Sequence, residues 1–193
     1  MSKKELIIIA GISGVGKTTV LEEAIKMASE RGKNYRVINF GDIMFEIAKN
    51  ENLVTHRDEM RKLPLNEQRN IQRLAAKKIA SMSYEENIIL DTHITIKTPK
   101  GYMPGLPIWV LEELEPTGIV LIEAAPEEIY ARRKRDNNRK RDTEPLERIN
   151  LHQIYNRYMA ASYSMVTGAT VDIVKNKEGK ILEAVKDLLS ILL

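Results

Sequence analysis

"IIIAGISGVGKTTVLEEA", residues 7–24, passes from an apolar run through a glycine-rich turn into an amphipathic segment. The pattern predicts a buried strand over residues 5–10 and a helix over residues 17–31. Between them, residues 11–18 satisfy the pattern G-x-x-x-x-G-K-[ST]. Glycines let the backbone wrap closely around phosphate oxygens, and the positive end of the helix points at the same place. The stretch therefore predicts a P-loop that binds a nucleoside triphosphate.

Individual residues of this loop have separate expected roles. Lys17 is expected to reach the β- and γ-phosphates and to be catalytic, whereas Thr18 is expected to offer its hydroxyl to Mg²⁺. Asp91 ends the apolar run "NIILD" and is expected to hold the same metal ion from its other side. The alternative for Asp91 is a helix cap or an ordinary loop aspartate. The expected ATP-binding residues are Gly11, Ile12, Ser13, Gly14, Val15, Gly16, Lys17, Thr18 and Thr19.

Apolar runs and amphipathic segments alternate along the rest of the chain. Further strands are predicted over residues 35–40, 87–91, 118–124 and 169–174. Helices are predicted after Asp42, over residues 57–82, from Pro126 and over residues 178–193. This alternation predicts an α/β fold with a five-stranded parallel sheet flanked by helices. We expect a single domain over residues 1–193, with the Gly/Pro-rich residues 98–107 forming a shaped loop after the third strand.

Composition narrows the class of protein. The chain has 193 residues, of which 43% are hydrophobic and 30% are charged, which is typical of a globular domain. There is no cysteine, which excludes a disulfide framework and a cysteine-based metal site. The apolar run after Lys3 and Lys4 has only about six residues, too few for a signal core or a membrane span. We therefore expect a cytoplasmic protein that does not bind membranes.

Positive charge is concentrated in one segment. The net charge of the whole chain is only +3, so it gives no indication of nucleic-acid binding. Residues 132–141, "RRKRDNNRKR", hold seven basic residues and one acidic residue. We expect a mobile lid over about residues 132–143, in which Arg135, Arg139 and Arg141 close over the phosphates and act in catalysis. A solvated loop and a nucleic-acid patch are the alternatives, and the absence of interleaved aromatic residues disfavours the patch.

The interval between the second and third strands is longer than a simple crossover requires. Residues 41–86 leave room for a helical insertion that binds an acceptor substrate. Arg57 and Arg61 are four residues apart, so on a helix they would share a face and could clamp a phosphate. Gln68 and Gln72 have the same spacing, and a glutamine amide can pair with the N6 and N7 edge of adenine. A solvated helix face is the alternative for both pairs.

The sequence shows no evident nucleophile or general base. A phosphate monoester has a second pKa near about 6, so at neutral pH it can attack as a dianion without a base. Transfer to a hydroxyl group would instead need a carboxylate, for which Asp42 or Asp91 could serve. Both acceptor types remain open at this point.

Five segments of the chain carry a family resemblance. They are "AGISGVGKTT" (10–19), "RDEMRKL" (57–63), "DTHITIKTPKGYMPGLP" (91–107), "RDNNRKRD" (135–142) and "HQIYNRYMAASYSMVTGA" (152–169). With them the chain resembles the archaeal-type adenylate kinases, a branch of the nucleoside monophosphate kinases. The resemblance implies the P-loop nucleoside monophosphate kinase fold, reversible conversion of ATP and AMP into two ADP with Mg²⁺, a mobile lid and a homotrimer.

The chain also departs from the common bacterial and eukaryotic adenylate kinases. Those enzymes have D-G-[FY]-P-R after the third strand, whereas this chain has Asp91 followed by "THIT". The AMP-binding arginine of that motif is missing, so Arg57 and Arg61 are the candidates to replace it. His93 is expected beside the transfer site, as an acceptor contact or as a packed structural residue. The alternatives to an AMP kinase are another small-molecule kinase, with CMP, UMP or a hydroxyl as acceptor, and a regulatory P-loop NTPase.

Overall fold

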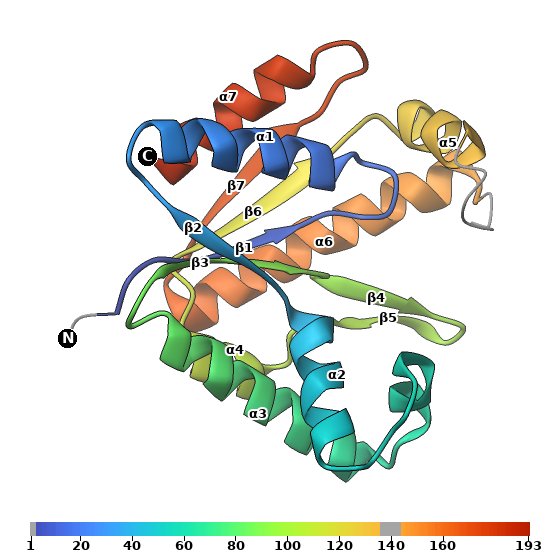
Figure 1. The fold of residues 1–193 in the computed structure, drawn as a ribbon. Coiled ribbons are helices and arrows are strands. Elements are labelled where there is room, and N and C mark those ends of the chain that lie inside the picture. The colour runs from blue at the N-terminus through green and yellow to red at the C-terminus, as the bar shows by residue number, and fades with distance from the viewer. Residues whose placement is uncertain (1–2, 136–143) are drawn as a thin grey trace.

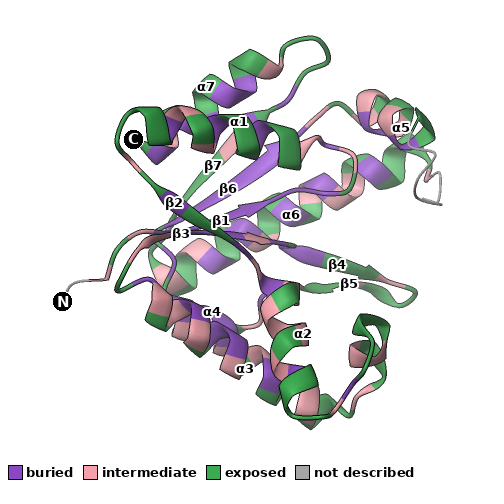
Figure 2. Cartoon of the chain, in the orientation of Figure 1, coloured by how far each residue is buried: buried purple, intermediate pink, exposed green. Residues whose placement is uncertain are grey.

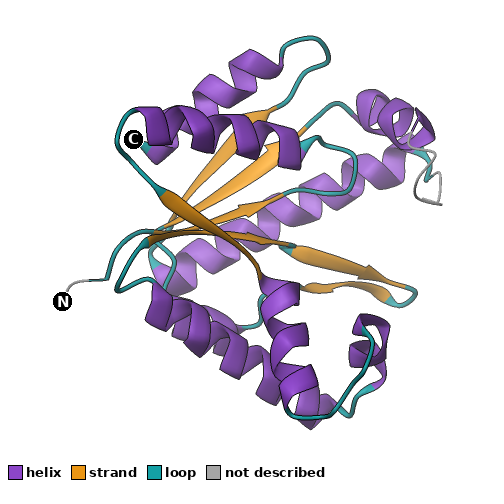
Figure 3. Ribbon diagram, in the orientation of Figure 1, coloured by secondary structure: helices purple, strands orange, loops and turns teal. Residues whose placement is uncertain are grey.

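The computed structural model describes residues 3–135 and 144–193. Its elements, in chain order, are β1 (Leu6–Ala10), α1 (Lys17–Glu30), β2 (Tyr35–Asn39), α2 (Phe40–Asn50), the 3-10 helix η1 (Arg57–Lys62), α3 (Leu65–Met82), β3 (Asn87–Thr92), β4 (Thr95–Thr98), β5 (Gly101–Pro104), α4 (Ile108–Leu114), β6 (Gly118–Glu123), α5 (Pro126–Arg135), α6 (Leu146–Thr167), β7 (Thr170–Lys175) and α7 (Ile181–Leu192). Figures 1 and 3 show their arrangement. Within the described ranges, no helix is long and apolar enough to cross a membrane.

A parallel sheet of five strands, in the order β2-β3-β1-β6-β7, forms the centre of the fold. The predicted α/β class and all five predicted strands are confirmed. Because β1 connects towards β2 and β3 connects towards β6, the connections diverge between β1 and β3. In open α/β sheets, ligands bind at the carboxyl ends of strands at such a divergence. The P-loop follows β1 and Asp91 lies near the end of β3, so the topology brings both to this place.

Two apolar layers sandwich the sheet. Every residue of β1 is buried, and its side chains alternate between the two layers as the pleat of a strand requires. Leu6 and Ile8 pack with residues of α3, α4 and α6, whereas Ile7 and Ile9 pack with residues of α1 and α7. Figure 2 shows this burial on the central strands and on the helix faces turned towards them. The rigid sheet therefore fixes the positions of the strand ends that carry polar residues.

The region after β3 differs from the expected loop. Residues 98–107 do not form an irregular connection, because Thr95–Thr98 and Gly101–Pro104 pair as an antiparallel hairpin. The hairpin packs against α6: the ring of Tyr102 stacks on Tyr155 at 4.6 Å, and Thr95 donates to Asn156 at 2.5 Å. These contacts, distant in sequence, stabilise strands that a Gly/Pro-rich segment would not form alone.

The basic segment is partly helical. Residues 132–135, which we expected in the lid, are the last turn of α5. The acidic side chains of Glu127 and Glu128 lie in the first turn and four basic residues in the last, which suits the helix dipole at both ends. Residues 136–143 of the expected lid, with Arg139 and Arg141, lie outside the described residues.

Candidate active site

The P-loop is shaped to receive an anion at the start of α1. Gly16 lies at φ 83°, in the left-handed region, and a Cβ there would collide with the amide of Asn176. Within the described chain, no side chain caps the helix that begins at Lys17. Its first N–H groups are therefore available to a phosphate.

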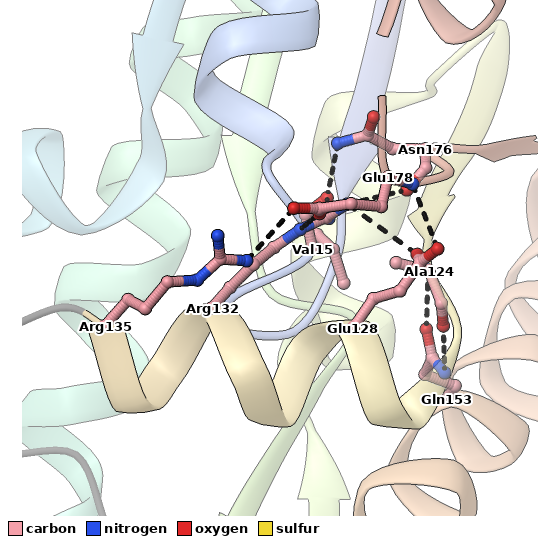
Figure 4. Close-up of polar contacts among 8 residues, drawn as sticks. All are labelled: Val15, Ala124, Glu128, Arg132, Arg135, Gln153, Asn176 and Glu178. Carbon is pink, nitrogen blue, oxygen red and sulfur yellow. Dashed lines mark hydrogen bonds and ion pairs between the residues drawn. The ribbon is translucent and has the colours of Figure 1, made fainter. Parts of the chain in front are cut away.

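The loop is held in place through its carbonyl groups, as Figure 4 shows for Val15. The carbonyl of Val15 accepts from Arg132 Nη1 at 3.1 Å and from Asn176 Nδ2 at 2.8 Å. The carbonyl of Ser13 accepts from Arg133 Nε at 2.8 Å. These bonds tie the loop to α5 and to the segment after β7. A phosphate site fixed before the ligand arrives needs little reorganisation on binding.

Lys17 and Asp91 meet at the divergence of the sheet. The Lys17 ammonium forms an ion pair with Asp91 Oδ1, and the two side chains are 15% and 26% exposed. Burial lowers the pKa of Lys17 from 10.5 to about 8. In this state the lysine charge is compensated by Asp91. A bound phosphate would replace the carboxylate as the partner of the lysine.

The residues present suit a magnesium ion that is carried in with the nucleotide. Thr18 is exposed at the first turn of α1. Asp91 supplies a hard carboxylate oxygen and is paired with Lys17, the residue before Thr18. Within residues 3–135 and 144–193, no cluster of three or more His, Cys, Asp or Glu forms a cage for a metal ion. Mg²⁺ commonly binds through one or two protein oxygens, substrate phosphates and water. The donor set therefore fits Mg²⁺ bound together with a phosphate chain.

Among the lid arginines, only Arg135 can be described. Its side chain is 65% exposed and pairs with Glu178 at 3.0 Å (Figure 4). Glu178 also pairs with Arg132, which donates to the P-loop carbonyl of Val15. Arg133 has a role that the sequence did not predict: it is buried and supports the P-loop by donating to the carbonyl of Ser13. It also pairs with Glu144 at 3.0 Å, and Glu144 forms a second ion pair with Lys97 of the hairpin. We call Arg133, Glu144 and Lys97 the lid clasp.

The acceptor arginines are not equivalent. Arg57 forms an ion pair with Asp42, and its Nη2 donates to Asn39 Oδ1 at 3.3 Å. Arg61 is exposed on the same element. The argument that they share a face is wrong, because residues 57–62 form a 3-10 helix with three residues per turn. In such a helix residues three apart are eclipsed, so Arg57 and Arg61 point in different directions.

The two glutamines also have structural partners. Gln68 Nε2 donates to the carbonyl of Leu63 at 2.7 Å. Gln72 Oε1 accepts from Trp109 Nε1 at 3.1 Å. Gln68 therefore keeps its Oε1 for a contact with a base, and Gln72 keeps its Nε2.

His93 lies between the two halves of the site. Its imidazole is exposed, yet partial removal from water lowers its pKa, and the charges of Lys17 and Arg57 lower it further. His93 is thus in the field of one cation from the P-loop side and one from the acceptor side. A neutral imidazole at this point can accept or donate a hydrogen bond without repelling either cation.

The site combines a P-loop with Lys17 and Asp91 at the divergence of the sheet, and Asn39 links Asp91 to Arg57 of η1. These features define a P-loop phosphoryl-transfer enzyme. Comparison with known proteins identifies the family within this class of enzymes. A family model described as an AAA domain matches residues 10–150. The adenylate kinase of Methanocaldococcus jannaschii is 53% identical over 190 residues, which cover 98% of this chain and 99% of that protein. The adenylate kinase of Methanopyrus kandleri is 54% identical over 184 residues, which cover 94% of each chain.

The chain therefore belongs to the adenylate kinase family. The resemblance recognised from the sequence is confirmed. A solved shikimate kinase from Bacteroides thetaiotaomicron shares the fold, with a TM-score of 0.57 over 97% of this chain and 98% of that chain. At 15% identity this likeness concerns the fold alone.

Proposed function

We propose that the chain catalyses reversible transfer of the γ-phosphoryl group of ATP to AMP, giving two ADP, with Mg²⁺ bound to the nucleotide. Its membership of the adenylate kinase family supports this reaction. The observation that carries the residue assignments is the chain of contacts that leads from Lys17 through Asp91 and Asn39 to Arg57. Residues 41–86 form the acceptor-binding insertion and about 132–143 the lid of a single kinase domain.

The donor side would hold ATP through residues 11–19. The amides of the P-loop and Lys17 neutralise the β- and γ-phosphates, and Thr18 and Asp91 would hold Mg²⁺. The ion supplies charge neutralisation at the β- and γ-oxygens when it is bound. Binding of the phosphates releases Lys17 from Asp91, so both groups become available for the nucleotide at the same moment.

The acceptor side would hold AMP with its phosphate facing the γ-phosphorus. An oxygen of the AMP phosphate forms a bond to the γ-phosphorus, and the bond from that phosphorus to the β,γ-bridging oxygen breaks. The electron pair leaves with the β-phosphate, so the products are two ADP and no base is required. Arg57 holds the attacking phosphate, His93 donates to it or to the γ-phosphate, and Gln68 or Gln72 contacts the base. Arg61, with its different direction, is the weaker of the two phosphate candidates.

Closure of the lid would complete the site. Arg135, Arg139 and Arg141 would reach the phosphates and exclude water, which prevents hydrolysis of ATP. We also propose, from the family resemblance, a cytoplasmic homotrimer. Sedimentation equilibrium measures the assembly, and a monomeric mass would contradict that part alone.

A coupled assay with ATP and a panel of acceptors tests the reaction. The panel contains AMP, GMP, CMP, UMP, shikimate and water, with and without Mg²⁺. We expect AMP to be the preferred acceptor and Mg²⁺ to be required. Phosphorylation of shikimate but not AMP would identify a hydroxyl kinase, and release of phosphate to water alone would overturn the kinase function.

A further inference from the structure

Asn39 occupies a junction that none of the assigned roles uses. It is the last residue of β2, and it lies in register with Asp91 on β3. It is also the N-cap of α2, the first helix of the acceptor-binding insertion. The side chain therefore lies where the sheet, the metal-side carboxylate and the insertion meet.

The amide of Asn39 contacts three different segments. Its Oδ1 accepts from the backbone N–H of Asp42 at 3.2 Å and from Arg57 Nη2 at 3.3 Å. Its Nδ2 donates to Asp91 Oδ2 at 3.5 Å. Two donors on one side and a carboxylate on the other fix the orientation of the amide, because only the oxygen can accept and only the nitrogen can donate. A carboxylate or a hydroxyl in its place could not make the same set.

The residues after Asn39 form a seat for Arg57. A Cβ at Gly41 would collide with the guanidinium of Arg57 and would lie 3.3 Å from Asn39 Oδ1. The guanidinium therefore lies close against the first turn of α2, where a Cβ at residue 41 would force it to move. Asp42 holds the guanidinium through its Nη1 atom, and Asn39 holds it through Nη2.

We propose that Asn39 is a positioning residue that fixes Arg57, on the acceptor side, relative to Asp91, on the metal side. The proposal rests on the proposed function, because it matters only if Arg57 holds the acceptor phosphate and Asp91 the metal. Transfer requires the attacking oxygen, the γ-phosphorus and the leaving oxygen to be in line, and a small displacement of either substrate slows the reaction. Because the amide of Asn39 is bonded to both Arg57 and Asp91, it would set the distance between the acceptor phosphate and the metal ion.

A simple helix cap is the competing explanation, and one substitution separates the two. Asn39→Ser keeps a side-chain oxygen that can accept from the N–H of Asp42, and serine is as good an N-cap as asparagine. Serine is too short to reach Arg57 and Asp91. We expect the KM for AMP to rise about tenfold. The Mg²⁺ concentration for half-maximal rate should also rise about tenfold, the lower end of the range of about 10- to 100-fold seen when groups supporting a metal ligand are removed.

Asn87→Ser is the matched control. Asn87 lies at the opposite, amino-terminal end of β3, and its amide also links separate segments, accepting from Glu5 N at 3.3 Å and donating to Asn34 O at 3.1 Å. The control should lower Tm about as much as Asn39→Ser and leave both kinetic parameters unchanged. If Asn39→Ser fails to fold, Asn39→Thr retains the cap and allows the same comparison.

A double-mutant cycle with Arg57→Gln tests whether Asn39 acts through Arg57. In the Arg57→Gln background, Asn39→Ser should raise the KM for AMP less than about threefold, because the group that it positions is already gone. Equal effects in both backgrounds would overturn the proposal, and so would an unchanged KM for AMP or an unchanged Mg²⁺ requirement in Asn39→Ser. A wild-type enzyme that does not phosphorylate AMP would instead refute the proposed function, so the two failures are distinguishable.

Discussion

The donor side and the acceptor side of the site are built differently. On the donor side, side chains of α5 and of the segment after β7 hold the P-loop carbonyls, and Lys17 is largely buried. On the acceptor side, η1 has no buried residue, and Arg57 and Asp42 are 53% and 62% exposed. A small cluster around Ala48, Val54 and Ile71 shares only the partly buried Met44 with one of the two main layers. The difference supports the proposal that ATP binds to a preformed cradle and that the more exposed acceptor segment adjusts when AMP binds.

Replacement of Lys17 should give the largest loss of activity, and it tests whether the donor side binds the phosphates of ATP. In Lys17→Met, the phosphates lose their main cation, and kcat should fall by about 10²–10³ or more. The fold should persist, because the methionine retains the apolar stem and removes a partly desolvated charge. Steady-state kinetics and circular dichroism measure the two effects. Near-normal turnover by a folded Lys17→Met protein would contradict the role of the loop.

Substitutions of Arg57 and Arg61 test whether the acceptor side holds the AMP phosphate. A charge-assisted hydrogen bond to phosphate contributes about 1.5–3 kcal/mol, so Arg57→Ala should raise the KM for AMP by about 10- to 100-fold. Arg61→Ala on the same 3-10 helix is the matched control and should change it less than about threefold. The KM for ATP should be unaffected in both. Equal losses in the two variants would mean that the clamp works despite the 3-10 geometry.

Arg135 should separate rate from stability. Its ion pair with Glu178 is exposed on both sides, and such pairs contribute about 0–1 kcal/mol to the free energy of unfolding. Arg135→Ala should therefore lower kcat about tenfold and leave urea denaturation almost unchanged. Glu178→Gln is the comparison: it keeps Arg135 and removes its ion pair, together with the ion pair between Glu178 and Arg132. If both variants slow the reaction alike, the ion pairs of Glu178 matter and not a phosphate contact of Arg135.

The lowered pKa of Lys17 predicts a small pH dependence of stability and of ATP binding. Burial lowers the pKa of Lys17 to about 8, so the empty folded protein releases this proton at lower pH than the unfolded chain does. From this group alone, stability should rise with pH between about 8 and 10.5. A bound phosphate favours the ammonium and raises the pKa again, so binding should take up a proton.

ATP affinity should accordingly be about twofold weaker at pH 8 than at pH 7. Isothermal titration calorimetry in buffers of different ionisation enthalpy measures both the affinity and the proton uptake. Lys17→Arg is the control, because its guanidinium remains charged throughout this range. The same pH dependence in Lys17→Arg would assign the effect to another group.

The sequence predicted those parts of the molecule whose evidence is local. The P-loop lies within nine consecutive residues, and each of the five sheet strands is a short apolar run with a clear end. Asp91 was found because it ends one of those runs. The placement of Lys17 against Asp91 then follows from the order of strands in a parallel sheet.

Contacts between distant residues could not be read from local patterns. The hairpin after β3 depends on α6, whose contacting residues are more than fifty positions away. Arg133 and Ser13 are separated by 120 positions, and a run of arginines does not show which one turns inward. Asn39 offered one usable signal, since an asparagine between a predicted strand and a predicted helix is typical of an N-cap. Nothing local connects it with Arg57 or Asp91. The 3-10 geometry of η1 had no periodic signal in six residues.

The lid clasp has a consequence for how this enzyme could be varied. Arg133 and Glu144 bring the two ends of the intervening segment together, and Lys97 anchors that junction to the hairpin. Because the ends are already joined, lengthening the segment between them changes the closure entropy slowly, by about 0.6 kcal/mol for each doubling of its length. The segment between Arg133 and Glu144 could therefore be lengthened without rebuilding the P-loop to which Arg133 is bonded, provided that Arg139 and Arg141 are kept. Arg133 and Glu144 mark the two ends between which insertions should be tolerated.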